Sequence, residues 1–149
     1  MSMLTFTRLL SWTGFAFVVI GLPLIGHCVR KDNRAHCALD GVLIEPIYHA
    51  RVVDEEGQSH VFCCLTCAKR WLEARHGLPQ VIFVTDESSG LEIKASEAYF
   101  AASSVVTVPT SRNSIHAFAN RSDAERQIKQ FGGTLLDEAD HPFVRSTNR

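Results

Sequence analysis

The chain has 149 residues, of which 15 are basic and 16 acidic, so its formal net charge at neutral pH is -1. A charge this balanced, without a long basic run, does not favour a nucleic-acid partner. The first thirty residues differ in composition from the rest, and the remaining length suits one domain with a buried core. The five cysteines are an odd number, so at least one has no disulfide partner within the chain.

Residues 1–30 are predicted to form a membrane anchor. Residues 9–29 contain no Asp, Glu, Lys or Arg, and a helix needs about 20 apolar residues to cross the hydrocarbon core of a bilayer. A cleaved signal peptide is the alternative. However, cleavage at Gly26 would need a small residue shortly before it, where the chain has the large Leu24. Similarly, His27 precedes Cys28 where lipid attachment needs a small residue. We therefore expect one uncleaved transmembrane helix.

The charges that flank this segment bear on its orientation. Arg30, Lys31 and Arg34 follow the segment, whereas only Arg8 and the amino terminus precede it. Because positively charged residues tend to remain on the cytoplasmic side, this small excess taken alone favours a cytoplasmic domain.

The next part of the chain is predicted to form a β-hairpin followed by a helix. Residues 47–53 alternate and are rich in β-formers, residues 54–57 have turn composition, and residues 58–62 are predicted as the returning strand. Apolar residues then recur at helical spacing from Leu65, and the Gly and Pro within residues 76–79 stop the helix.

Shorter elements are predicted to follow. Residues 80–86 are predicted as a buried strand, followed by a turn and a short segment at 91–94. We expect a short helix at 95–103 and another strand at 104–110.

The last predicted unit is a strand followed by a helix. Residues 114–120 alternate as a strand does, and Ser122 with Glu125 forms a capping box for a helix that Gly132 and Gly133 close. Residues 134–137 are predicted as a final strand and residues 138–149 as a loose tail. Strands interleaved with short helices, with evident hairpins, predict the α+β class.

Three cysteines lie within residues 63–67, where the predicted hairpin ends and the helix begins. Cys63 and Cys67 are one helical turn apart and can converge, as can Cys64 and Cys67. The positive end of the helix dipole and the unpaired N–H groups favour thiolates, so we expect lowered thiol pKa values there. Thiolates select soft ions such as Cu(I) or Zn(II), and Cys37 can return beside the hairpin as a third ligand.

Three other arrangements remain open for these cysteines. They can be ordinary buried core residues, although three so close together fit that role poorly. Cys37 and one cysteine of the cluster can form a disulfide if the domain is exported. A purely structural zinc can also close the fold through Cys37, Cys63, Cys67 and a histidine.

Histidines supply further candidate ligands. His116 lies on the polar side of its predicted strand and His36 neighbours Cys37, although most histidines at such positions are solvated or hydrogen-bonded. Cys64 points away from Cys63 if the strand alternation continues, so it is either a spare thiol or a redox partner.

No motif of a known enzyme class stands out. The sequence lacks a G-x-S-x-G elbow, a Walker sequence, an H-E-x-x-H pair and a glycine-rich dinucleotide turn. The Cys64-x-x-Cys67 spacing matches a thioredoxin-like motif, but the hairpin before it is not the βαβ context that such a motif needs. We therefore do not expect an enzyme.

The cysteine pattern resembles that of TRASH domains, which are small treble-clef-like metal-binding modules with an early cysteine and a later F-C-x-x-x-C. Cys37, Cys63 and Cys67 occupy those places. The longer run FCCLTCAKRWLEARHGLPQVIFVTD, followed by IKASEAYFAAS and SIHAFANRSDAERQIKQFGGTLLD, is similar to the NosL family, the copper accessory proteins of nitrous oxide reductase. The resemblance covers residues 37–137.

This resemblance implies a fold, a cargo and a place in the cell. It implies treble-clef-like hairpin and helix units packed as one small metal-binding domain over residues 31–137. The domain would hold Cu(I), with zinc as the alternative, and would pass it to a partner protein of unknown identity. NosL proteins are exported, so the resemblance favours the periplasmic side of a bacterial inner membrane, and we follow it against the charge count.

The implied ligands are thiols. Cys37, Cys63 and Cys67 are the expected metal ligands, with Cys64 and His116 as further candidates. Where the family usually has methionines, this chain has CALDGV and TSRNSIHAF, and its methionines are Met1 and Met3. Thiols, with help from His116, would therefore replace thioether ligands.

Two other functions remain as alternatives. One is a structural-zinc interaction module of a membrane complex. The other is a thiol protein that acts in redox chemistry or in organometal cleavage, since the NosL fold resembles that of organomercurial lyases.

Overall fold

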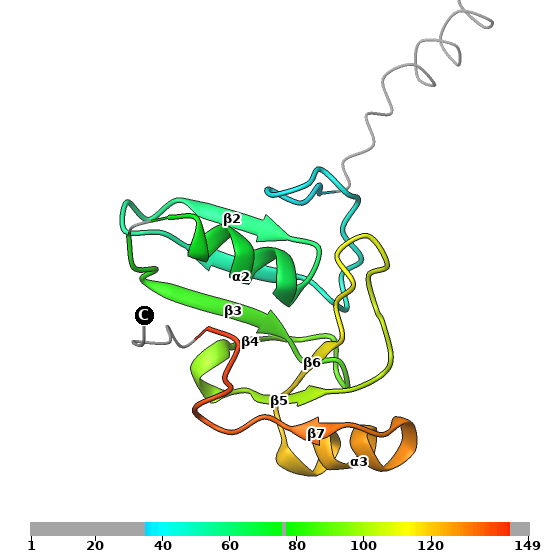
Figure 1. The fold of residues 1–149 in the computed structure, drawn as a ribbon. Coiled ribbons are helices and arrows are strands. Elements are labelled where there is room, and N and C mark those ends of the chain that lie inside the picture. The colour runs from blue at the N-terminus through cyan, green and yellow to red at the C-terminus, as the bar shows by residue number, and fades with distance from the viewer. Residues whose placement is uncertain (1–34, 76, 144–149) are drawn as a thin grey trace, which may run out of the picture. The chain divides into compact units, whose positions relative to one another are not determined.

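The computed structural model describes residues 35–75 and 77–143 (Figure 1). The anchor predicted at residues 1–30 lies outside these ranges. Within them, no helix has the length and apolar character needed to cross a bilayer. The described part of the chain is a mixed α+β fold with two antiparallel sheets and two α-helices, which confirms the predicted class.

The first sheet contains four antiparallel strands in the order β2-β1-β3-β4. Its strands are β1 (Ala50–Val53), β2 (Ser59–Phe62), β3 (Val81–Thr85) and β4 (Glu92–Lys94). Strands β1 and β2 form the predicted hairpin. Strand β1 starts later than predicted because residues 46–48 form a turn, in which the Tyr48 N–H donates to the Glu45 carbonyl at 3.1 Å.

One face of this sheet forms the core of the domain. Positions along β1 alternate between buried and half-buried, and the register places Ala50 between Phe62 and Val84, all three fully buried. Helix α2 (Leu65–Glu73) packs against β1 and β2. The rings of Trp71 and Phe62 lie 5.3 Å apart between centroids. Burial of this apolar surface holds the helix on the hairpin.

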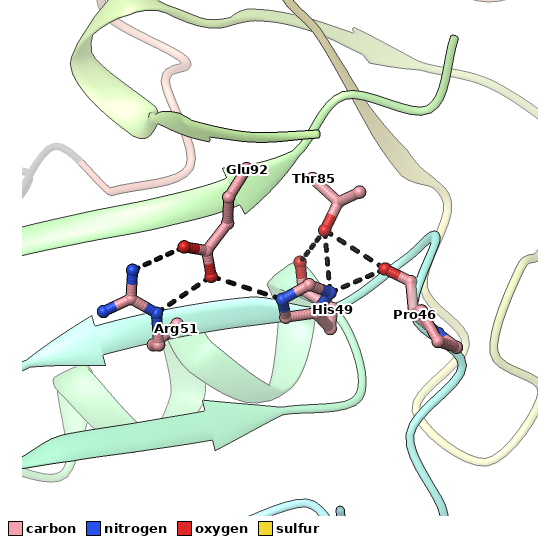
Figure 2. Close-up of polar contacts among 5 residues, drawn as sticks. All are labelled: Pro46, His49, Arg51, Thr85 and Glu92. Atoms are coloured by element: carbon pink, nitrogen blue, oxygen red, sulfur yellow. Dashed lines mark hydrogen bonds and ion pairs between the residues drawn. The ribbon is translucent and has the colours of Figure 1, made fainter. Parts of the chain in front are cut away.

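The opposite face of the sheet carries a polar network (Figure 2). Arg51 Nε donates to Glu92 Oε1 at 2.8 Å, and the guanidinium lies 4.1 Å from the centre of the Phe83 ring. His49 Nε2 lies 3.3 Å from the same Glu92 oxygen, while its Nδ1 lies 2.8 Å from the Thr85 hydroxyl. Arg51 and Glu92 are about a third exposed, so solvent competes for these contacts.

The second sheet contains three antiparallel strands in the order β6-β5-β7. Its strands are β5 (Tyr99–Ala102), β6 (Ile115–Phe118) and β7 (Thr134–Leu135), and a short 3-10 helix, η1 (Ala95–Glu97), precedes β5. Helix α3 (Arg121–Phe131) packs against the three strands, as Figure 1 shows.

Two predicted elements of this second half are wrong. Residues 95–103 were expected to be helical, but they form η1 and then β5, because pairing with two neighbouring strands outweighs local helix propensity. Residues 104–110 were expected to form a strand. In the described structure their only strand-like pairing is an isolated bridge between Val108 and Asn113.

Helix α3 ends at the predicted glycine, but it does not begin with the predicted capping box. The helix begins at Arg121 after Asn120, which makes no side-chain capping bond, so the predicted capping box at Ser122 is wrong. Gly132 closes the helix with a φ of +74°, a conformation that glycine adopts without the steric cost of a side chain. Within the predicted tail, His141 packs on the Phe100 ring at 4.8 Å between centroids.

Candidate metal centre

The loop that carries Cys37 folds back onto the hairpin. The Cys37 N–H donates to the Val42 carbonyl at 2.8 Å, and the Gly41 N–H donates to the Cys37 carbonyl at 2.9 Å. Gly41 has a φ of +71°, which suits glycine at this tight turn. The Ala38 N–H donates to the Val61 carbonyl at 2.9 Å and so ties the loop to β2. The loop therefore brings Cys37 to the end of β2.

Two more thiols come from the junction of β2 and α2. Cys63 directly follows β2 and Cys67 lies one helical turn further on, and their sulfurs are 3.5 Å apart. Both side chains are 1% exposed, and Cys37 is also buried. The ligand atoms of Cys37, Asp40, Cys63 and Cys67 all lie within 4.8 Å of one another. We call these four residues the cysteine cluster.

Asp40 completes the cysteine cluster, and the sequence analysis missed it. Its Oδ2 lies 3.3 Å from the Cys67 sulfur and 3.9 Å from the Cys63 sulfur, while its Oδ1 accepts the Val42 N–H at 3.1 Å. The sequence did contain a signal for this ligand. Cys37 and Asp40 have the same spacing as the two cysteines of a C-x-x-C zinc motif, with a carboxylate in place of the second thiol. The following Gly41 made the aspartate resemble ordinary turn chemistry.

The separations within the cysteine cluster fit a four-coordinate ion. With Zn–S bonds of about 2.3 Å and Zn–O bonds of about 2.0 Å, a tetrahedral site places two sulfurs about 3.8 Å apart and a sulfur and an oxygen about 3.5 Å apart. The Cys63–Cys67 separation of 3.5 Å and the Asp40 separations of 3.3 and 3.9 Å are close to these values. The donors are therefore already gathered at ligand spacing.

Burial controls the protonation of the thiols. Loss of hydration raises the pKa of Cys67 far above its usual range, and Cys64, Cys63 and Asp40 add to the effect. Burial also raises the pKa of Cys63, and Cys64 again adds to the effect. The expected lowering of thiol pKa values is therefore wrong for Cys63 and Cys67, because burial and the neighbouring Cys64 raise both values. A coordinated cation supplies the charge that deprotonates such thiols.

Asp40 is an anionic acceptor beside these thiols. Burial by itself raises the pKa of Asp40, but hydrogen bonds from the Cys37 thiol, the Val42 amide and the Cys67 thiol outweigh it and hold the pKa below its usual value. The carboxyl group is therefore ionised at neutral pH, as a metal ligand must be.

Cys64 lies next to the cysteine cluster but is not one of its four residues. Its backbone is extended at the N-cap of α2, and its sulfur lies 3.0 Å from the Ser111 hydroxyl. The same loop supplies Asn113, whose side-chain oxygen accepts the Thr66 N–H at 3.3 Å. The start of α2 is thus held by a distant loop. All four described cysteines are free thiols, so the described chain contains no disulfide from Cys37.

His116 is not brought to the cysteine cluster either. The ring is 1% exposed, its Nδ1–H donates to Glu87 Oε2 at 2.8 Å, and the Ser103 hydroxyl lies 3.0 Å from its Nε2. The succession of contacts from Ser103 through His116 to Glu87 resembles that of a hydrolytic triad. However, the Ser103 N–H donates to Ser114 and the Val105 N–H donates to the Ser103 hydroxyl, so neither amide is available to stabilise an oxyanion. Both ring nitrogens of His116 therefore have partners within the protein, away from the cysteine cluster.

Comparison with solved structures shows a likeness of fold. The chain matches the crystal structure of the copper chaperone NosL from Shewanella denitrificans with a TM-score of 0.61 and 22% sequence identity, over 71% of this chain and 88% of that one. At this identity the likeness concerns the fold alone. No protein-family profile matches the sequence, and no curated protein matches it. The fold and the cysteine cluster together define a small α+β domain with a candidate metal site.

Proposed function

We propose that this protein binds a soft metal ion, Cu(I) in the first place, and passes it to a partner protein. The observation that carries the proposal is the convergence of three buried thiols and one carboxylate within 4.8 Å. Thiolates are the donors that Cu(I) prefers. The likeness of the fold to a copper chaperone supports the choice of cargo. Cys37, Cys63 and Cys67 act as the thiolate ligands, held in a treble-clef-like unit of loop, hairpin and helix.

Delivery by such a site requires exchange of ligands. A cage closed by four strong donors does not readily release its metal, whereas a site with an accessible position does. In the cysteine cluster the thiols are buried and Asp40 is exposed. A partner's sulfur ligand approaches on the Asp40 side, and each new bond from the metal to the partner replaces one bond to this protein. The role is that of a carrier and not of an enzyme.

We place this activity at a bacterial inner membrane. Residues 1–30 serve as a single-pass tether, and the metal-binding domain lies on the periplasmic side. The uncharged run at residues 9–29 and the family resemblance support this placement.

Metal titration of thiol variants tests the proposal. The full chain is purified without oxygen in a mild detergent, and Cu(I) and Zn(II) affinities are measured by competition with a colorimetric chelator. We expect one Cu(I) per chain, with affinity reduced by at least about 100-fold in Cys63→Ser and in Cys67→Ser, because each loses a thiolate ligand.

Cys64→Ser is the matched control, because Cys64 is an equally buried cysteine in the same short segment. It should retain the wild-type Cu(I) affinity within about threefold. Wild-type Cu(I) affinity in both Cys63→Ser and Cys67→Ser, or no Cu(I) binding by the wild type, would contradict the proposal.

A structural zinc site is the second candidate, because Asp40 provides a fourth donor. The two functions differ in what metal removal does. A structural zinc domain unfolds when chelated, whereas a carrier remains folded and reloads. Circular dichroism before and after chelation distinguishes them.

A further inference from the structure

We propose that Asp40 decides which metals the cysteine cluster accepts. With the carboxylate as the fourth ligand, the site holds divalent ions such as Zn(II) in four-coordinate form, whereas Cu(I) is held by the thiolates alone. This inference rests on the proposed metal-binding function and deepens it by assigning a specificity residue.

The position of the carboxylate is set by the turn that carries it. Asp40 Oδ1 accepts the Val42 N–H at 3.1 Å. The same turn is closed by a hydrogen bond from the Gly41 N–H to the Cys37 carbonyl. These bonds leave Oδ2 directed at the sulfurs of Cys67 and Cys63, at 3.3 and 3.9 Å. The two oxygens therefore have separate tasks, because one fixes the turn and the other faces the thiols. A donor fixed in this way is preorganised for a ligand.

The donor types separate the two kinds of ion. Zn(II) accepts sulfur and carboxylate oxygen together and is usually four-coordinate and tetrahedral in proteins. Cu(I) is a soft ion that prefers thiolate and thioether sulfur, and carboxylates suit harder ions. Asp40 thus adds a ligand for Zn(II) and contributes little bonding to Cu(I).

The charges favour the same division. Once a bound ion has displaced the thiol protons, the three thiolates and the Asp40 carboxylate together carry four negative charges around it. A divalent ion offsets two of these charges and a monovalent ion only one, and uncompensated buried charge is costly. Removing the carboxylate charge weakens the attraction for a divalent ion about twice as much as for a monovalent one, so Zn(II) binding should fall more than Cu(I) binding.

Asp40→Asn is the sharpest test, because asparagine retains an Oδ1 to accept the Val42 N–H and replaces Oδ2 with a group that is not a ligand. Zn(II), Co(II) and Cu(I) affinities are measured on the full chain in detergent without oxygen. We expect Zn(II) affinity to fall by at least about 30-fold and Cu(I) affinity to stay within about threefold. The visible absorption of bound Co(II) should also change, since it reports the ligand set.

Two further samples separate ligation from general effects of charge and folding. Glu45→Gln removes an exposed carboxylate from the same region outside the cysteine cluster and should leave each affinity unchanged. On the wild-type protein, ¹¹³Cd NMR gives a shift that depends on the number of sulfur and oxygen ligands. It needs no variant to fold, and we expect a shift typical of three sulfurs and one oxygen.

The outcomes distinguish this inference from the function on which it rests. If Asp40→Asn keeps wild-type Zn(II) affinity, or loses Zn(II) and Cu(I) equally, or if ¹¹³Cd has sulfur ligands only, Asp40 is not the specificity residue. Cu(I) binding that still depends on Cys63 would then leave the proposed function standing. If the wild-type protein binds no metal, the proposed function fails first.

Discussion

The cysteine cluster and the His116 group, formed by Ser103, His116 and Glu87, both bury polar side chains but pair them differently. Both ring nitrogens of His116 have partners within the protein, at 2.8 and 3.0 Å. In the cysteine cluster the donors face one another, and burial raises the pKa values of Cys63 and Cys67. Fully paired polar groups serve structure, whereas convergent donors that lack a balancing charge are suited to a cation.

The two groups also join different parts of the domain. Glu87 follows β3 of the first sheet and its N–H donates to the Ala117 carbonyl at 3.0 Å, while His116 lies on β6 of the second sheet. The His116 group therefore fastens one sheet to the other in the absence of any ligand. The cysteine cluster joins the Cys37 loop to α2, and a metal would strengthen that junction.

Removal of the imidazole should cause the largest loss of stability. His116→Ala leaves the Glu87 carboxylate without its buried partner and opens a cavity, so we expect the free energy of unfolding to fall by about 3 kcal/mol. Chemical denaturation measures it. Metal affinity of the folded variant should remain within about threefold of wild type.

His116→Gln is the matched control, because its amide can replace one of the two hydrogen bonds and should recover part of the lost stability. A folded His116→Ala variant that had lost its metal affinity would show that the histidine acts on the site after all. The His116 group would then belong to the metal site and would not be a separate structural pairing.

Metal addition should have the next largest effect, at the cysteine cluster alone. At a free metal concentration about 100 times Kd, binding to the folded state adds about 2.7 kcal/mol to the free energy of unfolding. Metal should therefore raise the melting temperature of the wild type and of His116→Ala, but not that of Cys67→Ser. An equal shift in Cys67→Ser would place the metal elsewhere on the protein.

Loss of the Cys64 thiol should have a smaller effect. Serine at this position can still pair with Ser111, but it exchanges a buried sulfur for a more polar hydroxyl, so we expect a loss of about 1 kcal/mol. Metal affinity should be unchanged. A Cys64→Ser variant with weakened metal binding would extend the cysteine cluster to a fourth thiol.

The part of the site that the sequence predicted depends on short-range geometry. The strand alternation and turn composition between residues 47 and 62 predicted the hairpin, and one helical turn between Cys63 and Cys67 predicted their convergence. The missed features depend on distant partners. Asp40 reaches the sulfurs of Cys63 and Cys67 only because the Cys37 loop folds back onto β2, a contact that its local spacing from Cys37 does not reveal.

The errors in the fold have the same origin. The alanine-rich segment around β5 favours a helix locally and became a strand through pairing with β6 and β7. His116 was expected on a polar face, yet its partners Glu87 and Ser103, which lie 29 and 13 residues away in sequence, bury it. Local propensity cannot predict contacts over such separations.

The exposed pair of Arg51 and Glu92 should show the smallest effect on stability. Arg51 and Glu92 on the outer face of the first sheet are paired like the His116 group but are open to solvent (Figure 2). The hydrogen bond from Arg51 lowers the pKa of Glu92 below its ordinary value of 4.5. Glu92→Gln should therefore cost only about 0.5 kcal/mol at pH 7, as is usual for a solvent-screened pair.

The sign of the pH dependence follows from this lowered pKa. The stability that the Arg51–Glu92 pair contributes is present above the unfolded-state pKa of 4.5 and disappears as the pH falls through the lower folded-state pKa. Urea denaturation of wild type and Glu92→Gln between pH 7 and pH 3 should give two curves that converge at the acid end. Glu97→Gln, which breaks a more exposed pair with Lys94, should differ less from wild type at each pH. A Glu92→Gln difference that stayed constant down to pH 3 would mean that packing of the side chain, and not its charge, supplies the stability of this face.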